Sequence, residues 1–230
     1  HFSHHIRYSI AQVTKKKLTF RQKKHTVNDN QTNTIYKQED PNTNDSRRKK
    51  VFMNSGILSL PPGYTHVQHT FDPVFDTHSR ILILGSFPSV KSRENQFYYG
   101  HPQNRFWKLM ARLLNVPVPQ SIDEKKTMLL THGLALWDVI ASCDIKGSSD
   151  SSIKNAVPAD ISRILKAANI QTIIANGGTA FRLYRRYCEP VTGRPAALCP
   201  STSPANAAFS LERLSECWSK FIIRSPSAVP

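Results

Sequence analysis

The sequence predicts an α/β fold of three layers, α/β/α, with a central, mostly parallel sheet of four strands. Two observations lead to this prediction. Four short apolar runs have the length of buried strands, and they alternate with longer segments whose apolar residues recur at helical spacing. A third observation, the uneven distribution of charge, separates a basic N-terminal segment from the part of the chain that can form a core.

The net charge of +15 divides into +8 over residues 1–52 and +7 over residues 53–230. We interpret 1–52 as a basic, disordered tail, because its apolar content is too low to offset the entropy of ordering the chain. Three readings of this tail stay open: sequence that is dispensable or not native, a segment that attracts phosphate, and a targeting segment. Residues 53–230 are long enough to form one domain with a sizeable core.

The first elements of this domain follow from apolar runs and capping residues. Residues 80–85 form an apolar run closed by glycine, the pattern of a buried parallel strand. A helix is expected over 104–114, where apolar side chains have helical spacing. Ser121 and Glu124 form the pattern of a capping box, which predicts a helix that ends at Gly133.

The remaining elements continue the alternation. A second strand is expected over 134–140, and a helix that begins at Pro158 and ends near 168. The third strand, 170–175, leads through two glycines into a helix that ends near Tyr187. The last predicted strand and helix span 197–199 and 205–222.

Ligands of such sheets bind outside the carboxyl ends of the strands, so the loops at those ends are the candidate site. They are the segments 85–89, 176–177 and 200–204, together with Asp138. No phosphate-binding Gly-x-x-x-x-Gly-Lys-Ser/Thr, no Gly-x-Gly-x-x-Gly and no Gly-x-Ser-x-Gly occurs, which argues against the common nucleotide-binding and hydrolase folds. No apolar run reaches 18 residues, so no membrane-spanning helix is expected.

Metal and disulfide chemistry receive little support. The four cysteines, at 143, 188, 199 and 217, include no Cys-x-x-Cys, and scattered single thiols suit a reducing intracellular compartment. His66 and His69 form a weak His-x-x-His signal, for which a solvated loop before the first strand is the simpler reading. We therefore expect no metal and no organic cofactor.

Two motifs in the predicted strand-end loops resemble those of the uracil-DNA glycosylase superfamily. The first is Gly-Ser-Phe-Pro-Ser at 85–89 with Phe-Tyr-Tyr-Gly-His-Pro-Gln-Asn-Arg-Phe-Trp at 97–107, and the second is Cys-Pro-Ser-Thr-Ser-Pro-Ala-Asn at 199–206. Their wording is most similar to the hypoxanthine-DNA glycosylase branch, and the similarity covers about three fifths of the chain. The resemblance implies a uracil-DNA glycosylase-like fold.

The resemblance also assigns expected roles to residues. Asn104 is the expected catalytic residue, which would orient water or hydrogen-bond the base; capping of the following helix is the alternative reading. Many relatives in the mismatch-specific branches have a water-positioning Asn where this chain has Phe87, which cannot do this. The remaining assignments are a base pocket of Gly85, Ser86, Phe87 and Tyr99, DNA contacts from Ser201, Thr202, Ser203, Asn206 and Lys91, and Asp138 as an alternative base. Lys91, Arg93 and Arg105 flank the first motif and are candidates for phosphate contacts.

The expected activity is that of a monofunctional DNA glycosylase, which flips a deaminated base, hypoxanthine above all, out of DNA and hydrolyses its glycosidic bond. Removal of uracil or mismatched bases is the nearest alternative, and a catalytically silent nucleic-acid-binding module is an alternative of another class. The expected partner is DNA containing deaminated bases, without a membrane, and the protein is expected to be a monomer. Its expected location is intracellular: nuclear or mitochondrial in a eukaryote, cytoplasmic in a prokaryote.

Overall fold

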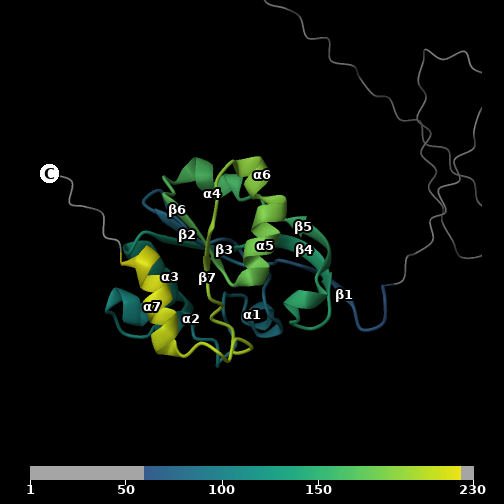
Figure 1. The fold of residues 1–230 in the computed structure, drawn as a ribbon, viewed down its shortest axis with the longest axis horizontal. Coiled ribbons are helices and arrows are strands. Elements are labelled where there is room, and N and C mark those ends of the chain that lie inside the picture. Colours follow the sequence, from purple (N-terminus) through teal and green to yellow (C-terminus); the bar gives the residue numbers. More distant parts are fainter. Residues whose placement is uncertain (1–59, 224–230) are drawn as a thin grey trace, which may run out of the picture. The chain divides into compact units, whose positions relative to one another are not determined.

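The central sheet has the predicted four strands, all of them parallel (Figure 1). The computed structural model describes residues 60–223, so the predicted tail over 1–52 lies outside the described residues. The strand order is β3-β2-β6-β7. The bounds are β2 (Ile81–Gly85), β3 (Leu134–Asp138), β6 (Thr172–Asn176) and β7 (Ala197–Cys199).

Helices cover both faces of this sheet, as the three-layer prediction requires. Along β2 the side chain of Ile83 packs into one core, whereas Leu82 and Leu84 pack into the other. The first core is closed by α2 (Phe106–Leu114), α3 (Ile122–Thr131) and α7 (Leu211–Ile222). The second is closed by α4 (Ser162–Ala167) and α5 (Gly178–Tyr187). Figure 1 shows α2, α3 and α7 on one side of the strands and α4 and α5 on the other.

A second sheet, which the sequence pattern did not predict, packs beside the second core. It is antiparallel, with the order β1-β4-β5, and consists of β1 (Thr65–Gln68), β4 (Ile140–Ile145) and β5 (Lys154–Pro158). Cys143 and Ile145 of β4 point into the core. His66 therefore lies in a strand, and the reading of His66 and His69 as parts of a solvated loop is wrong.

Two predicted boundaries change because of this sheet. The apolar run over 134–140 is divided between β3 and β4, since the chain leaves the parallel sheet after Asp138 and Ile140 pairs with Pro158. Pro158 ends the edge strand β5 instead of beginning a helix, and an edge position tolerates the missing N–H of proline. The helix begins later, at Ser162.

Capping residues determine where other helices begin and end. The capping box at Ser121 is present, and Gly133 follows α3 with a left-handed φ of 65°. The last helix begins at Leu211 and not at 205, because Ser210 accepts a hydrogen bond from the N–H of Arg213, 3.3 Å away. Three short helices were not predicted: α1 (Val90–Glu94), the 3-10 turn η1 (Asp150–Ser152) and α6 (Glu189–Thr192).

The four cysteines are free thiols. Cys143, Cys188 and Cys199 are buried, and burial raises the pKa of each, to about 11, about 11 and about 12 respectively. Cys217, on α7, is partly exposed. No helix within residues 60–223 is long and apolar enough to cross a bilayer.

Candidate active site

An open cleft of about 1340 Å³ lies where the parallel strands end, as the topology predicts. Its walls are the loop after β2, the end of β3, the β4–β5 connection, the start of α5 and the loop after β7. Both sequence motifs therefore meet here, although about 100 residues separate them in the chain. Of the predicted site residues, the following line the cleft: Gly85, Ser86, Phe87, Lys91, Tyr99, Asn104, Asp138, Ser201, Thr202, Ser203 and Asn206.

Asp138, at the end of β3, is a buried carboxylate whose two oxygens have different surroundings. Its Oδ2 lies 3.1 Å from Nε2 of His69, and the two side chains are 6 % and 4 % exposed. A β-carbon at Gly85 would collide with Oδ1 of Asp138 and would lie 3.4 Å from the hydroxyl oxygen of Tyr99. Glycine at position 85 thus makes room for the carboxylate. The residue that holds it, His69, was not expected at the site.

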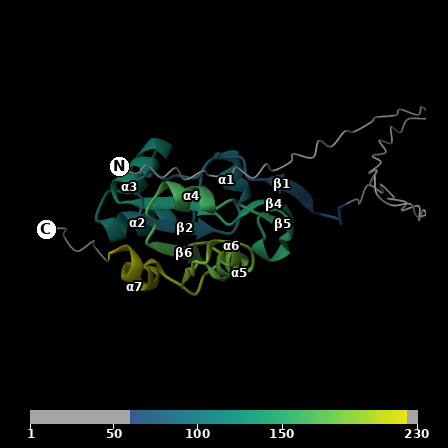
Figure 2. The ribbon, with the colours of Figure 1, turned by 90° about the horizontal axis from the view of Figure 1, so that it is seen from above.

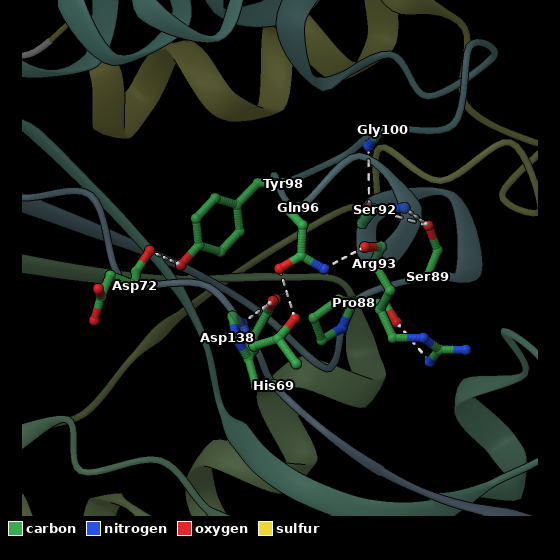
Figure 3. A network of polar contacts seen from close by, with 11 residues as sticks. His69, Asp72, Pro88, Ser89, Ser92, Arg93, Gln96, Tyr98, Gly100 and Asp138 are labelled. Atoms are coloured by element: carbon green, nitrogen blue, oxygen red, sulfur yellow. Dashed lines mark hydrogen bonds and ion pairs between the residues drawn. The ribbon is translucent and has the colours of Figure 1, made fainter.

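The two adjacent tyrosines of the first motif have different environments. Tyr98 is 2 % exposed, and its hydroxyl donates to the carbonyl oxygen of Asp72 at 3.0 Å (Figure 3). Tyr99 has a left-handed φ of 52°, and its ring stacks on Phe106 with centroids 4.1 Å apart. Within the described residues, the buried hydroxyl of Tyr99 has no hydrogen-bond partner. Burial, together with the negative charge of Asp138, raises the pKa of Tyr99, so the phenol stays neutral.

Phe87, a predicted pocket residue, belongs both to the core and to the wall of the cleft. It is 7 % exposed and packs in the second core, and its ring also lines the cleft. The ring of His69 meets it edge-on at 6.4 Å between centroids. An apolar ring at this position gives the cleft a dry wall, but it supplies no group that could hold water.

A second carboxylate, missed by the sequence analysis, enters the cleft from η1. The hydroxyl of Ser86 donates to Oδ2 of Asp150, so the proton of Ser86 is directed away from other acceptors. Burial raises the pKa of Asp150; the hydrogen bond from Ser86 opposes this shift, and the charge of Asp138 adds to it. The residues around Asp150 are mostly polar, but only the β4–β5 pairing brings them to the first motif.

The first motif is stiffened by its own serines (Figure 3). Ser89 accepts from the N–H of Ser92 at 3.2 Å, and the hydroxyl of Ser92 accepts from the N–H of Gly100 at 3.0 Å. Lys91, a predicted DNA contact, forms an exposed ion pair with Glu94 at 2.7 Å. A phosphate would have to compete with Glu94 for this ammonium group.

Asn104 lies two residues before α2, whose N-cap residue is Arg105, and it lines the cleft. Its Oδ1 accepts from the N–H of Phe106 at 3.0 Å, so the carbonyl side of the amide serves the start of the helix. Its Nδ2 has no hydrogen-bond partner within residues 60–223, which leaves a donor for a ligand. Asn104 is thus not the N-cap residue that was considered for it, because Arg105 has that position. Its Oδ1 bonds just ahead of the helix, and this leaves the other end of the amide available for a ligand.

Hydrogen bonds to buried groups fix the loop of the second motif. Asn176, at the end of β6, donates through Nδ2 to the hydroxyl of Thr202 at 2.9 Å and accepts from its N–H at 3.0 Å. Thr202 is 0 % exposed, so its predicted contact with DNA does not fit this geometry. Ser201 and Ser203 accept from backbone N–H groups two residues further on, and Asn206 donates to the carbonyl of Ser201 at 2.9 Å.

Arg105 connects the two motifs. Its guanidinium donates to the carbonyl oxygens of Ser203 and Phe209, to that of Asn206 at 3.0 Å and, through Nε, to that of Thr202 at 3.3 Å. All three of its nitrogens are thereby engaged with carbonyl oxygens of the second motif or of Phe209, three residues after it. The predicted phosphate contact from Arg105 is therefore replaced by a structural role.

Comparisons with known proteins agree with the motifs. The family model described as "Uracil DNA glycosylase superfamily" matches residues 73–222. A protein named hypoxanthine DNA glycosylase from Methanosarcina acetivorans is 34 % identical over 151 residues, which are 65 % of this chain and 95 % of that protein. A protein of the same name from Methanosarcina barkeri is 37 % identical over 111 residues, 46 % of this chain and 69 % of that protein.

A solved structure is also similar. It is a solution NMR structure of a Methanosarcina acetivorans protein provisionally described as a uracil DNA glycosylase. It superimposes with a TM-score of 0.58 at 33 % identity, covering 66 % of this chain and 94 % of that one. Sequence and fold thus point to the same group of proteins.

Proposed function

The chain belongs to the uracil DNA glycosylase superfamily, and from this premise we propose that it is a monofunctional DNA glycosylase that removes hypoxanthine from DNA. One observation carries the proposal: both family motifs converge on one cleft at the carboxyl ends of the parallel strands. The two relatives named hypoxanthine DNA glycosylase support hypoxanthine as the base.

The cleft offers what hydrolysis of a base–sugar bond requires. The extruded base needs an apolar wall, which Phe87 and the ring of Tyr99 provide. The reaction develops positive charge on the sugar and negative charge on the departing base. We assign to Nδ2 of Asn104 a hydrogen bond to the base or to the attacking water, because this donor is unused within the protein.

The two carboxyl groups suit the stabilisation of the positive charge that develops on the sugar. Asp138 and Asp150 place two carboxyl groups beside the cleft, and in their charged form these would stabilise a cationic sugar. Asp138 stays the alternative base, as one of its oxygens is not used by His69. Neither quoted motif contains a lysine, which supports simple hydrolysis over a Schiff-base lyase step.

The proposal extends to the setting of the reaction. The substrate is DNA that contains a deaminated base, the protein acts as a monomer, and it works where DNA is kept, inside the cell. The nearest alternative is removal of uracil, because the superfamily model and the related NMR structure have uracil in their descriptions.

The test is one panel of labelled duplexes that contain hypoxanthine, uracil, xanthine or a mismatched thymine, scored for strand breaks after alkali. We expect hypoxanthine to be released fastest, with no break before alkali. The Asn104→Ala protein serves as the control for contaminating glycosylases. Preferential release of uracil would replace the proposed substrate, and no release from any duplex would leave a nucleic-acid-binding module as the better reading.

A further inference from the structure

Few free cations line the cleft, although its ligand is a polyanion: of the two lysines in its wall, only Lys220 has no ion pair within residues 60–223. Asp138 and Asp150 both line it. Two of the side chains predicted to contact phosphate already have partners within the protein. Lys91 pairs with Glu94, and Arg105 is bonded to the second motif. Because phosphate contacts supply most of the affinity for DNA, additional cations near the cleft are required.

The outer face of the antiparallel sheet has such cations. Asp144 pairs with His66 on β1 and with Lys154 on β5, so these three side chains share one face of the sheet. Alternation along the strands places Lys146 and Tyr64 on this same face, opposite to Ile145 and its neighbours in the core.

Lys146 and Lys154 meet at one aromatic ring. The two ammonium nitrogens lie 4.9 Å and 4.8 Å from the ring centroid of Tyr64. Both lysines are exposed, and within residues 60–223 neither forms an ion pair. The acid on this face, Asp144, is instead bonded to His66 at 2.7 Å and to Asn155 at 2.6 Å, which lowers its pKa. Two like charges thus share one ring, and residues 60–223 supply no counterion within ion-pair distance of either.

The position of this group relates it to the cleft. Lys146 directly follows β4, and Ile145 and Ser148 on either side of it line the cleft. A nucleic-acid strand that leaves the cleft over the β4–β5 connection would pass the two lysines. An aromatic ring flanked by cations is the arrangement with which proteins hold a strand, since the ring stacks on a base or sugar while the cations bind phosphates.

We propose that Tyr64, Lys146 and Lys154 form a second DNA-binding site, which holds the strand flanking the flipped nucleotide. This proposal takes from the proposed function only that DNA is the ligand. It assigns to the small antiparallel sheet a role in binding, whereas the parallel sheet carries the chemistry. The site recognises the sugar–phosphate backbone, so it does not depend on the damaged base.

The test compares two double variants with the same change of charge. Lys146→Gln/Lys154→Gln removes the proposed contacts. The control, Lys125→Gln/Lys126→Gln, removes two lysines of α3 that also lie over rings, at 5.3 Å from Trp107 and 5.9 Å from Phe97. Helix α3 lies on the opposite side of the molecule from β1, β4 and β5 in both views (Figure 1 and Figure 2).

Binding is measured by fluorescence anisotropy with undamaged duplexes over a series of salt concentrations. For the first variant we expect about tenfold weaker binding at low salt, and a slope of log K against log salt that is smaller by about 1.8, since each phosphate contact contributes about 0.9. The difference should disappear with duplexes too short to extend beyond the cleft. The single-turnover cleavage rate at saturating enzyme should not change.

Equal slopes for the two double variants would overturn the second site. So would a defect that is independent of duplex length, because it would place the lysines at the cleft itself. Tyr64→Phe should bind like the unchanged protein and Tyr64→Ala more weakly; equal binding by both would remove the ring from the site. Since undamaged DNA is used, failure of the proposed glycosylase activity would appear separately, in the cleavage panel.

Discussion

The two motifs that line the cleft use their polar side chains in different ways. The first presents groups to the cleft: the ring of Tyr99, Nδ2 of Asn104 and the face of Phe87. The second directs its groups inward, where Thr202 bonds to Asn176 and the backbone carbonyls bond to Arg105. Both motifs lie within residues 73–222, the range that matches the superfamily model. Resemblance therefore locates a site without separating the residues that touch a ligand from those that hold the walls.

The largest effect should come from Asn104→Ala, which tests whether the first motif performs chemistry. We expect cleavage of hypoxanthine to slow by about 100- to 1000-fold, the range for loss of one well-placed polar donor. DNA affinity should change little, since phosphate contacts supply most of it. Single-turnover cleavage and anisotropy measure the two quantities.

Asn104→Asp is the companion variant, because Asp can accept the same bond from the N–H of Phe106 but has no Nδ2 donor. If only capping matters, Asp behaves like the unchanged protein and Ala costs about 1 kcal/mol of stability. A fully active but less stable Ala protein would contradict the catalytic assignment and move attention to Asp138.

Arg105→Gln tests whether the second motif depends on the first for its shape. The loop loses several charge-assisted hydrogen bonds, each worth about 1.5–3 kcal/mol, so we expect the protein to be less stable by about 3 kcal/mol. Thermal and urea unfolding measure the loss. The salt dependence of DNA binding should stay the same, whereas a phosphate contact from Arg105 would reduce its slope.

A smaller effect is expected for Tyr99→Ala, which removes a stacking face worth about 1–3 kcal/mol for a base. Tyr99→Phe should be nearly silent, since the hydroxyl has no partner to lose within the described residues. The measurement for both variants is the concentration of enzyme that gives half-maximal single-turnover cleavage. A Phe variant as impaired as Ala would mean that the hydroxyl itself binds the substrate.

The smallest effect concerns Asp150, where the first motif meets the β4–β5 connection. Because its pKa is raised by burial, the stability linked to this group is fully present below its ordinary pKa of 3.8 and is lost as the pH rises through the raised value. Asp150→Asn should therefore be more stable than the unchanged protein at neutral pH, and the gain should vanish below about pH 4.

The measurement is the thermal midpoint of Asp150→Asn over a pH series, with Asp160→Asn, on the surface, as the matched control. A gain that does not depend on pH would show that the amide helps for a reason other than charge.

The parallel half of the molecule could be predicted from sequence, and the antiparallel half could not. Strands such as β2 and β6 are continuous apolar runs, because both faces are buried, and such runs are recognisable without neighbours. In contrast, β1 and β5 are mostly exposed and contain polar residues and a proline, so their pairing with β4 is a tertiary effect.

The same distinction applies to the site. Gly85, Asn104 and Asp138 stand at strand or helix ends that the pattern located. His69 follows β1 and Asp150 lies in the β4–β5 connection, so only tertiary pairing brings them to the site; the His-x-x-His pattern gave no indication of a contact with Asp138. The inward bonding of Thr202 was equally hidden, since a hydroxyl residue in a loop has the same sequence pattern whether it faces solvent or Asn176.

The uneven burial of the four cysteines makes the protein suitable for selective labelling. Cys143, Cys188 and Cys199 are covered and are held as unreactive thiols at neutral pH, whereas Cys217 is partly exposed on the wall of the cleft. A maleimide dye should attach at Cys217 without prior removal of the other thiols. Placed there, it would report the arrival and departure of a strand in real time, in the unmutated protein.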